Sequence, residues 1–479
     1  MVKDKQTHDP PLTSMDLASI SARYAGKYLL RNEIYLDDAK FNTLHARNYF
    51  KKTSSIQHHF FHSTCNRCHN RKQSLMGTIP CEKCGKTHVY CRNCIQMGRV
   101  MSCEPLYEWV GPQPQWPIHT NACTWEGQLT PAQKHAAAEM AKAVKHTISE
   151  LLTWAVCGAG KTEMLFPAIE EALSHGKRIC IATPRSDVVR ELLPRIKAAF
   201  KGIHVQGLYG GSKDNEGDTE LIISTTHQLL RFKDAFDVMI IDEVDAFPYY
   251  NDPSLISASR RALKKRHTIL YLTATPRKEF KKRMKRRILP YVFVPTRFHG
   301  NPLPIPTFKM CFSLKKDLKK HQVPNALIQW MENREKKHRQ VLIFVSAIQL
   351  AEKVTGDLRE RFAAKNQNVI MHVHADDKQR KEKVNAFRNK EIDILVTTTI
   401  LERGVTFPSV DVAILDAGHE VFDEAALVQI AGRAGRSVDD PTGEVLFFHD
   451  GKTMAMKEAV QSIEDMNKRG VLKGELSNL

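Results

Sequence analysis

Long apolar runs are missing from this 479-residue sequence. The first residues, MVKDKQTHDPPLTSMDLAS, contain no apolar core of signal-peptide length, and no later stretch approaches the unbroken apolar run of a membrane-spanning helix. Low-complexity tracts and short-period repeats are missing as well. These absences argue against a secreted or membrane-spanning protein, and we expect a cytoplasmic one.

Acidic residues are scarce relative to basic ones. Lys and Arg number 71 against 53 Asp and Glu, which gives a formal charge of +18 and a pI near 9.3. A surface with this excess attracts polyanions, so nucleic acid is the first partner to consider. Charge alone fits a basic protein without such a partner equally well.

Cysteine is scarce outside one segment. Of the eleven cysteines, six lie between Cys65 and Cys94 in CxxC pairs, and the others are scattered. With 42% hydrophobic and 26% charged residues, the chain has an ordinary globular composition and is long enough for two or three domains. Such a fold needs no disulfides, and a reduced compartment with a local metal site explains the pairs better.

Short apolar segments alternate with helix-length segments from residue 151 onward. In the first half the expected strands are LLTWAV, RICIAT, HVQGLY, LIIST, DVMIID and TILYLT, and the expected helices include KTEMLFPAIEEALSHG and DVVRELLPRIKAAF. Uninterrupted apolar strands are typical of a parallel sheet that is covered on both faces. The alternation predicts a doubly wound α/β domain over residues 127–295.

A proline-rich stretch, PTRFHGNPLPIPTF, interrupts this alternation at residues 295–308. It has neither helical nor strand periodicity, and we interpret it as an interdomain linker. Beyond it the expected strands are VLIFVS, NVIMHVHA, DILVTTT, VDVAILD and GEVLFFHD, and the expected helices include AIQLAEKVTGDLRERFAAK and QRKEKVNAFRNK. The sequence therefore predicts a second α/β domain over residues 309–470.

A glycine loop, AVCGAGKT, follows the first expected strand. Its glycines allow backbone N–H groups to surround phosphate oxygens at a helix N-terminus. Lys161 then reaches the β- and γ-phosphates, and the Thr162 hydroxyl binds Mg²⁺. Ala155 stands where the strict pattern has glycine, and an incidental glycine turn is the alternative. The expected nucleotide-binding residues are Gly158, Ala159, Gly160, Lys161 and Thr162.

An acid motif, IIDEVD, ends the strand that begins at DVMIID. Such a strand end lies at the edge where an α/β sheet binds ligands. In this motif Asp242 would hold the Mg²⁺ shell, while Glu243 would orient and polarise the attacking water. A solvated strand exit is the alternative, but it does not account for the glycine loop upstream. We therefore predict catalytic roles for both acids.

Two further motifs follow the acid motif. LTATP offers small hydroxyl side chains for hydrogen bonds near the acids, although it is also a common strand end. QIAGRAGR carries Arg433 and Arg436, spaced to project into a cleft and neutralise charge on the γ-phosphate. Arg436 is the first choice for this arginine finger and Arg433 the second. A basic helix end on the surface would explain the arginines but not the adjacent glycines.

The cysteine pairs occupy residues 60–105, after a segment, residues 1–59, that carries no interpretable motif. Two CxxC pairs complete one tetrahedral Cys₄ zinc site, so three pairs are one too many. Buried or redox-active thiols are the alternative to zinc. Histidines of the HHFFH segment can also ligate metals, but a histidine-rich surface turn is the simpler interpretation. Cys157, inside the glycine loop, is given no role.

The motifs stand in the order typical of superfamily 2 helicases. The resemblance rests on AVCGAGKT, IATPRSDVVREL, ISTTHQLL, DEVD, LTATP, LIFVSAIQ, TTTILERGVTFP and QIAGRAGR, and covers most of residues 128–450. It implies two tandem RecA-like domains that hydrolyse ATP while moving on nucleic acid. It also implies that Gln133, within LTPAQ, contacts adenine. Contacts to the nucleic-acid backbone are implied for residues 183–185, 225–226 and 397–399.

Several segments resemble one family more closely. DEVDAFPYYNDP, RFHGNPLPIP, TTILERGVTFPSVDV, GRSVDDPTGEVLFFHDG and the cysteine module ending in YCRNCIQMGR are similar to the ComFA family, the late-competence ATPases of Gram-positive bacteria. The outer cysteine pairs, CNRC and YCRNC, match that family. The resemblance therefore implies a zinc site of Cys65, Cys68, Cys91 and Cys94. Cys81 and Cys84 remain a competing or auxiliary pair.

The resemblance to ComFA also implies an activity and partners. It implies an ATPase that is stimulated by single-stranded DNA and helps to bring transforming DNA into the cytoplasm. The implied partners are a membrane pore and a phosphoribosyltransferase-like protein, which would hold the chain at the inner face of the cell membrane. The expected cofactors are ATP, Mg²⁺ and Zn²⁺. The sequence leaves strand separation, polarity and oligomeric state open.

Two other functions compete with this one. A PriA-type replication-restart helicase also binds zinc and also reads GRAGR, but its cysteine clusters lie inside the motor, and this chain lacks room for that family's extra N-terminal domain. A non-hydrolysing zinc protein with a relic motor belongs to a different class. Its difficulty is the complete set of ATP-site residues, Lys161, Asp242, Glu243 and Arg436.

The densest basic run, KEFKKRMKRRILP, spans residues 278–290. The basic residues at 281–283 and 285–287 can follow the backbone of single-stranded DNA, but a solvated helix face is the slightly favoured interpretation. No aromatic residue for base stacking stands between these six. Phe60, Phe61 and Tyr90 accompany the cysteine module instead. Small zinc folds also use aromatic residues as core, so these three do not by themselves indicate a binding surface.

Overall fold

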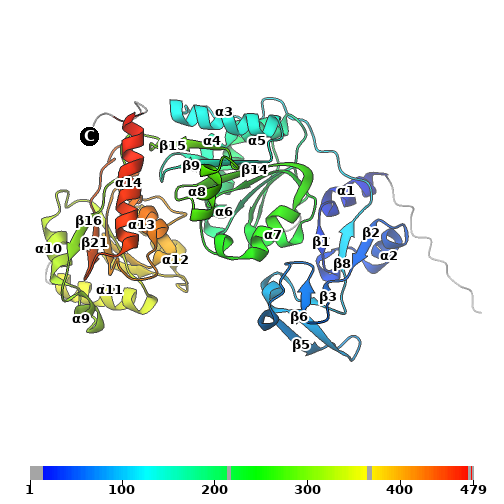
Figure 1. Cartoon of the computed structure of the whole chain (residues 1–479), viewed down its shortest axis with the longest axis horizontal. Coiled ribbons are helices and arrows are strands. Elements are labelled where there is room, and N and C mark those ends of the chain that lie inside the picture. Colours follow the sequence, from blue (N-terminus) through cyan, green and yellow to red (C-terminus); the bar gives the residue numbers. More distant parts are fainter. Residues whose placement is uncertain (1–13, 213–216, 364–368, 473–475, 477–479) are drawn as a thin grey trace, which may run out of the picture. The chain divides into compact units, whose positions relative to one another are not determined.

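The computed structural model describes residues 14–212, 217–363 and 369–472 and residue 476. The chain forms two compact units (Figure 1). One consists of Met1–Glu126, Met140–Leu151 and Phe166–Tyr271, and the other of Gly127–Glu139, Leu152–Leu165 and Leu272–Leu479. Both predicted parallel sheets are present, which confirms the predicted α/β architecture.

The N-terminal region folds around a small antiparallel sheet. Its strands, in spatial order, are β1 (Tyr28–Leu29), β8 (Leu106–Trp109) and β2 (Phe50–Thr53), and its helices are α1 (Ser14–Tyr24) and α2 (Asp38–Ala46). Aromatic side chains make up much of its core, namely Tyr24, Phe41, Phe50, Tyr107 and Trp109. Because β8 follows the cysteine module in the sequence, residues before and after the module share one sheet. Residues 1–13 of the segment expected to have no motif lie outside the described part.

The cysteine module is inserted between β2 and β8. It contains the hairpin β3 (Ile56–His58) and β4 (Ser63–Cys65), and an antiparallel sheet of β5 (Met76–Pro80), β6 (Thr87–Cys91) and β7 (Val100–Met101). The expected boundary between the N-terminal segment and the cysteine module, between residues 59 and 60, lies inside the first hairpin, because Ile56 pairs with Cys65. Besides cysteines, the buried apolar side chains of residues 54–105 are Ile56, Met76, Met97, Val100 and Met101.

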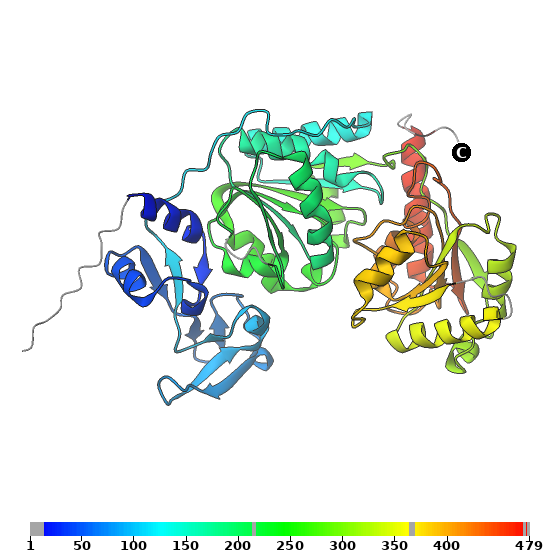
Figure 2. The same cartoon turned by 180° about the vertical axis from the view of Figure 1, so that it is seen from behind.

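The first α/β sheet has seven strands in the order β11-β12-β10-β13-β14-β9-β15, and helices flank both of its faces (Figures 1 and 2). The strand β10 is buried at every position, which explains why its sequence is apolar without alternation. The strands are β9 (Glu150–Ala155), β10 (Ile179–Thr183), β11 (Val205–Leu208), β12 (Leu221–Thr225), β13 (Phe236–Ile241), β14 (Leu263–Thr273) and β15 (Tyr291–Val294).

The helices of this first α/β region are α3 (Pro131–Lys145), α4 (Lys161–Met164), α5 (Phe166–Leu173), α6 (Ser186–Ala199), α7 (Pro253–Arg261) and α8 (Lys278–Lys285). The helix expected after the glycine loop is therefore two helices, divided at Leu165. Pro167 explains the division, because proline has no N–H to donate and is tolerated in the first turn of a helix. Strand β15 was missed by the sequence pattern, although it pairs in parallel with β9.

The second α/β sheet is parallel throughout, in the order β16-β21-β20-β17-β19-β18. Its strands are β16 (Thr307–Met310), β17 (Gln340–Phe344), β18 (Ile370–Val373), β19 (Ile394–Thr397), β20 (Val410–Leu415) and β21 (Val445–His449). Its helices are α9 (Leu314–Lys319), α10 (Asn325–Asn333), α11 (Ile348–Phe362), α12 (Arg380–Arg388), α13 (Glu424–Ala431) and α14 (Met454–Leu472). The last two residues of the helix expected over residues 347–365 lie outside the described part of the chain.

The proline-rich stretch, expected to be an interdomain linker, makes several contacts with the second α/β domain. Arg297 is 1% exposed, and Leu303 exchanges backbone hydrogen bonds of 2.9 Å with the side chain of Asn467 in α14. Strand β16 begins at Thr307, so the second sheet starts inside the expected linker. The stretch lacks periodicity because its contacts are made by single residues and not by a repeating face.

Candidate ATP site and cysteine cluster

The glycine loop connects β9 to α4. Gly158 and Gly160 have φ values of 80° and 69°, a conformation that side chains with a Cβ rarely adopt. The loop then enters α4 at Lys161, while the Thr162 side chain is buried beside it. This is the strand, loop and helix arrangement that binds phosphates through backbone N–H groups. The local structure expected for the five nucleotide-binding residues is therefore present.

Gln133, expected to contact adenine, lies at the same loop. Its Nε2 donates a 2.8 Å hydrogen bond to the carbonyl of Ala159, and its Oε1 accepts one of 2.7 Å from the N–H of Thr130. A Cβ on Gly160 would come within 2.5 Å of this Nε2. Glycine at position 160 therefore permits this close approach as well as the backbone conformation, and a side chain there would displace the Gln133 amide.

The acid motif continues directly from β13. Strands β10 and β13 pair in parallel with Ala182 opposite Ile241, and the N–H of Asp242 donates a 2.9 Å hydrogen bond to the Ala182 carbonyl. Asp242 Oδ1 accepts a hydrogen bond of 2.9 Å from the N–H of Glu243, whose φ is 53°. Both acids therefore stand directly after the end of β13, the position expected for them. Their roles toward a cation and toward water stay predictions.

Hydroxyl residues follow several strands of the two sheets, as the helicase resemblance implied. In the LTATP motif the N–H of Thr275 donates a 3.0 Å hydrogen bond to Thr273 Oγ1. Thr183 and Thr226 are fully buried, and the buried Thr397 hydroxyl donates to the Val373 carbonyl at 3.0 Å. These buried hydroxyls face the interior, not a polymer on the surface. The partly exposed members of the segments implied to touch nucleic acid include Arg185, Thr398 and Thr399.

The two arginines of QIAGRAGR have different surroundings. Arg433 is 2% exposed and donates to the carbonyls of Glu402 and Val405, which ties the end of α13 to the LERGV segment. Arg436 is half-buried, and its Nε donates a 2.9 Å hydrogen bond to the Gly432 carbonyl. Arg433 thus stabilises the motif, whereas Arg436 keeps the more accessible guanidinium.

Two side chains outside the predicted set contact this motif, one from the glycine loop and one from the proline-rich stretch. The Cys157 thiol donates a 3.0 Å hydrogen bond to Gln429 Oε1. Arg297 donates to the carbonyls of Ala434, at 2.8 Å, and Gly435. Burial, followed by the charge of Arg436, lowers the pKa of Arg297 to about 9. Sequence reasoning gave Cys157 no role, and no pattern distinguished Arg297 from other linker residues.

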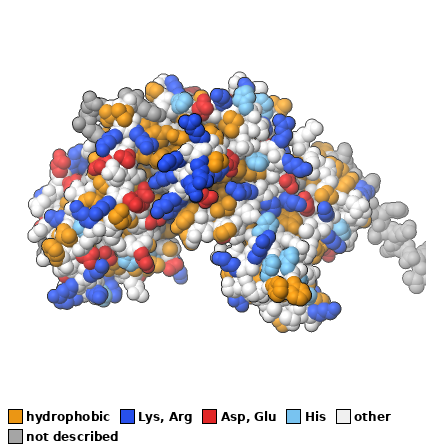
Figure 3. Space-filling model, viewed as in Figure 1, with side chains coloured by type: hydrophobic (Ala, Val, Ile, Leu, Met, Phe, Trp, Pro, Cys, Tyr) orange, Lys and Arg blue, Asp and Glu red, His pale blue; other side chains and the backbone are white. Residues whose placement is uncertain are grey.

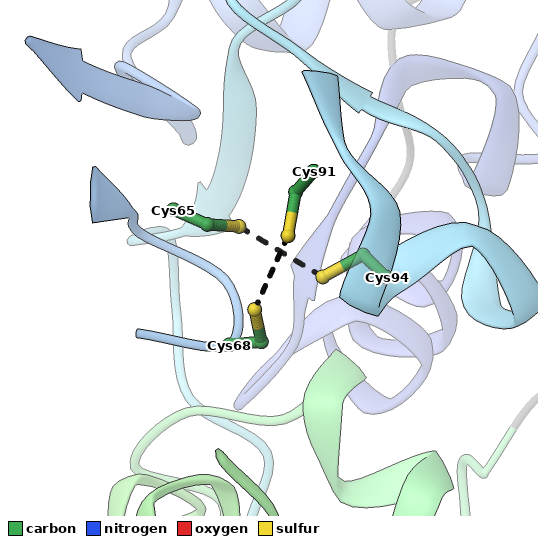
Figure 4. Close-up of side chains that lie close together, drawn as sticks. All are labelled: Cys65, Cys68, Cys91 and Cys94. Atoms are coloured by element: carbon green, nitrogen blue, oxygen red, sulfur yellow. Dashed lines mark hydrogen bonds between the residues drawn. The ribbon is translucent and has the colours of Figure 1, made fainter. Parts of the chain in front are cut away.

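Four cysteine thiols meet inside the N-terminal module (Figure 4). Cys65 ends β4, Cys91 ends β6, and Cys94 lies in the 3₁₀ helix η3 (Arg92–Met97). The Sγ atoms of Cys65 and Cys94 are 3.8 Å apart, and those of Cys68 and Cys91 are 3.6 Å apart. All four residues are at most 1% exposed. The structure thus brings together the outer pairs and leaves Cys81 and Cys84 out of this cluster.

The cysteine cluster packs on the first α/β domain through Arg67, which lies between Cys65 and Cys68 and is fully buried. Arg67 donates to Glu33 Oε1 at 2.8 Å, and Arg231 donates to the same oxygen at 2.8 Å. Arg231 ends η4 (Thr226–Arg231), the segment that begins directly after β12. Arg261 at the end of α7 donates to the carbonyls of Arg67 and, at 2.8 Å, of Leu230. No sequence motif indicated these contacts.

Exposed side chains of two kinds lie on separate parts of the chain. The basic run lies on and after α8, where Lys281, Lys282 and Lys285 are exposed and Figure 3 shows Lys and Arg side chains gathered. Phe60 and Phe61, at the turn between β3 and β4, are 95% and 90% exposed. Neither ring is therefore part of the core of the module, so the interpretation of these two residues as core aromatics is excluded.

Family descriptions match three parts of the chain. "Competence protein ComFA N-terminal domain" matches residues 13–108, "Type III restriction enzyme, res subunit" residues 126–278, and "Helicase conserved C-terminal domain" residues 321–438. The two last descriptions cover most strands of the two parallel sheets and leave out β15, β16 and β21. They identify tandem RecA-like helicase domains, which bind ATP with Mg²⁺.

Individual proteins agree with this assignment. The competence protein ComFA of Bacillus subtilis is 45% identical over 92% of this chain and 94% of its own length. ComFA of Streptococcus pneumoniae is 39% identical over 83% of this chain and 92% of its own. A variant of Saccharomyces cerevisiae Dbp5, solved with RNA and ADP-BeF3, shares the fold with a TM-score of 0.51, 16% identity, and coverage of 74% of this chain and all of that one. The chain therefore belongs to the ComFA family of competence-associated, helicase-like ATPases.

Proposed function

We propose that this chain is an ATP-driven translocase on single-stranded DNA that drives uptake of transforming DNA during competence. The observation that carries the proposal is the combination of a complete set of ATP-site motifs on two RecA-like sheets with a cysteine module packed against η4. The sequence resemblance implies a nucleic-acid contact for residues 225–226, where β12 ends and η4 begins, although Thr226 itself is fully buried. A polymer bound at this junction would lie near the cysteine module. We therefore expect a change in the module to alter the response of the motor to the polymer.

The ATP chemistry is assigned to residues with local geometry suited to each role. Lys161 and the loop from Gly158 to Thr162 bind the phosphates, and Asp242 with the Thr162 hydroxyl holds Mg²⁺, which neutralises phosphate charge. Glu243 orients the attacking water. Arg436 stabilises charge that develops on the γ-phosphate, since its guanidinium is accessible, while Arg433 positions the segment. Gln133 recognises adenine once its amide turns from the loop carbonyl.

The four buried thiols fit a structural zinc ion. Zn–S bonds of about 2.3 Å place tetrahedral sulfurs about 3.8 Å apart, and the cluster has 3.8 and 3.6 Å for its two opposed pairs. The pKa of Cys91 is lowered because the thiols of Cys65 and Cys68 hydrogen-bond to its sulfur. Asn70 Nδ2 lies 3.9 Å from the same sulfur, as a partner outside the ligand set. We assign one Zn²⁺ to Cys65, Cys68, Cys91 and Cys94.

Single-stranded DNA is the proposed polymer. The formal charge of +18 supplies long-range attraction, and the exposed lysines of α8 can follow phosphates. Phe60 and Phe61 offer stacking faces that are independent of sequence, because every base has a π-face. A positive surface together with exposed aromatic rings is the combination that single-stranded nucleic acid requires.

The proposed partners are a membrane pore and a phosphoribosyltransferase-like protein of the uptake machinery, which would hold the chain at the inner face of the membrane. Within the described residues, no helix combines the length and apolarity needed to cross a bilayer. Capture of the pore protein by the purified chain, with and without DNA, tests this part of the proposal.

ATP turnover with four polymers tests the central activity. Rates are measured with no nucleic acid, single-stranded DNA, duplex DNA and RNA, at matched nucleotide concentration and fixed salt. We expect single-stranded DNA to stimulate most, and the stimulation to fall steeply with salt through counterion release. Equal or stronger stimulation by RNA, or none by any polymer, would overturn the assignment to DNA uptake.

A further inference from the structure

The inner cysteine pair lies in the turn of the second hairpin of the module, between β5 and β6. Cys81 and Cys84 flank this turn, and two other metal-ligating side chains approach it. The Sγ of Cys103, which follows β7, is 3.7 Å from the Sγ of Cys81. The Nε2 of His88, on β6, is 3.1 Å from the Sγ of Cys84. Three segments of the chain thus bring three thiols and one imidazole to one end of the sheet.

The turn has the backbone of the CxxC loop in the Cys₄ cluster. In the loop from Cys65, the Cys65 N–H donates to Asn70 O at 3.0 Å and the His69 N–H donates to Cys65 O at 2.8 Å. The Cys81 loop repeats both bonds with the same spacing, from Cys81 to Lys86 O at 2.9 Å and from Gly85 to Cys81 O at 2.8 Å. The fifth residue of each loop has positive φ, 57° at His69 and 70° at Gly85. The two loops are therefore the same structural unit.

The inner pair differs from the outer pairs in exposure. Cys81 is partly exposed, whereas all four residues of the Cys₄ cluster are buried. Cys84 is exposed, so its side chain has room to turn toward a shared ion.

His88 is oriented by a second hydrogen bond. Its Nδ1 lies 3.1 Å from Ser102 Oγ, which leaves Nε2 directed at Cys84. A ligating histidine commonly has its other ring nitrogen fixed in this way. The Ser102 N–H also donates to the Val89 carbonyl at 2.9 Å, and this bond brings the following residue, Cys103, beside the turn.

We propose that Cys81, Cys84, His88 and Cys103 form a second zinc site at the tip of this hairpin. The first cluster uses Cys91, three residues further along β6, so the two sites would be separated by about 10 Å of extended strand. The ion crosslinks the hairpin turn to the chain between β7 and β8. It is a structural site, since all of its coordination positions are taken by protein ligands.

Metal content of the full-length protein tests the second site. Protein purified under reducing conditions without chelator should contain two Zn²⁺ per chain by elemental analysis. Cys81→Ser, Cys103→Ser and His88→Ala should each lower this to one, and Cys123→Ser, a thiol outside both groups, should leave two. X-ray absorption on the wild type should show seven sulfur ligands for each nitrogen ligand.

Cobalt substitution separates the two sites without relying on folding of a variant. Co²⁺ in four-sulfur and three-sulfur-one-nitrogen sites absorbs differently, so a titration of metal-free wild type should show two successive spectra. One Zn²⁺ per chain that is unchanged by Cys81→Ser would overturn the proposal. A Cys81–Cys103 disulfide in freshly isolated protein, detected by thiol counting, would overturn it as well. Neither readout depends on ATPase or DNA binding, so failure here leaves the proposed function unaffected.

Discussion

The motor domains and the cysteine module are held together by different interactions. A cluster of nineteen buried side chains forms part of the core of the second α/β domain, whereas the module's buried apolar residues are few and its cysteines occupy its centre. In the motor the chemical groups lie at strand ends, outside an apolar core that folds without them. In the module the chemical groups are the core. Removing a functional residue should therefore inactivate the motor but unfold the module.

The largest expected effect is on ATP turnover. Lys161→Ala removes the phosphate-binding charge, and Glu243→Gln removes the group that orients water, so each should reduce hydrolysis by about 10²-fold or more. Metal content and thermal unfolding should stay at wild-type values, because neither side chain supports a core. Steady-state ATPase assays, elemental analysis and calorimetry measure the three quantities.

Lys197→Ala, an exposed lysine on α6, is the matched control and should turn over normally. Glu243→Gln should still bind ATP, which separates loss of chemistry from loss of binding. Near-normal turnover in Lys161→Ala would show that the glycine loop is not part of the ATP site.

The second prediction concerns the cysteine module, where loss of a functional residue should also unfold the surrounding structure. Cys65→Ser should lose the Zn²⁺ of the Cys₄ cluster, since binding of a structural zinc ion contributes folding free energy directly. Residues around β4 and η3 should then become sensitive to protease, while nucleotide binding by the motor persists. Stimulation of the ATPase by single-stranded DNA should fall more than the basal rate.

Cys123→Ser controls for the substitution itself. Elemental analysis, limited proteolysis and binding of a fluorescent ATP analogue are measured on both variants. The contrast between the regions fails if Cys65→Ser retains its metal, or if ATP binding is lost together with the metal.

The same contrast explains what could be predicted from the sequence. Strands such as β10 and β13 were predictable because parallel strands buried on both faces are uniformly apolar and end in polar motifs. The N-terminal sheet was not, because β1 has two residues and its partner β8 lies on the far side of the module. The four thiols were expected from the ComFA resemblance alone, since three CxxC pairs fit one Cys₄ site in more than one way.

Single buried charges were also beyond the reach of the sequence. Arg67 and Arg297 lie in segments without periodicity, and their importance comes from carbonyls and a carboxylate supplied by distant residues. Conversely, threonines such as Thr183 belong to a motif implied to contact nucleic acid, yet are buried. A motif specifies the identity of its residues, but it does not specify which of them are exposed at the surface.

The third prediction tests the contact between the two regions. Glu33 accepts from Arg67, whose side chain is fully buried, and from Arg231. Glu33→Gln leaves the buried guanidinium without a counter-charge, and removal of one partner of a buried pair typically costs about 3–5 kcal/mol. The free energy of unfolding should fall accordingly, with Zn²⁺ retained and stimulation by DNA reduced.

Asp38→Asn is the control for an ion pair, because Asp38 contacts Arg31 at 2.5 Å but is 90% exposed. Exposed pairs contribute little, so its stability should be unchanged. Denaturant titration and DNA-stimulated ATPase assays are measured on both variants. If Glu33→Gln behaved like Asp38→Asn, the contact at Glu33 would have no part in coupling the module to η4.

The smallest expected effect concerns the exposed aromatic pair of the module. Phe60→Ala and Phe61→Ala should each weaken binding of single-stranded DNA by about 1–3 kcal/mol, the usual contribution of one base stacked on an aromatic ring. Fluorescence anisotropy at several salt concentrations measures this, and the salt dependence should stay unchanged because no phosphate contact is removed. Lys282→Ala on α8 should instead reduce the slope of log Kd against log salt by about 1.

Phe312→Ala removes an equally exposed ring, 92% accessible, from the second α/β domain and should leave the affinity unchanged. Equal losses in Phe60→Ala and Phe312→Ala would assign the effect to surface hydrophobicity in general. No loss in either Phe60→Ala or Phe61→Ala would leave metal binding, and not DNA contact, as the function of the module.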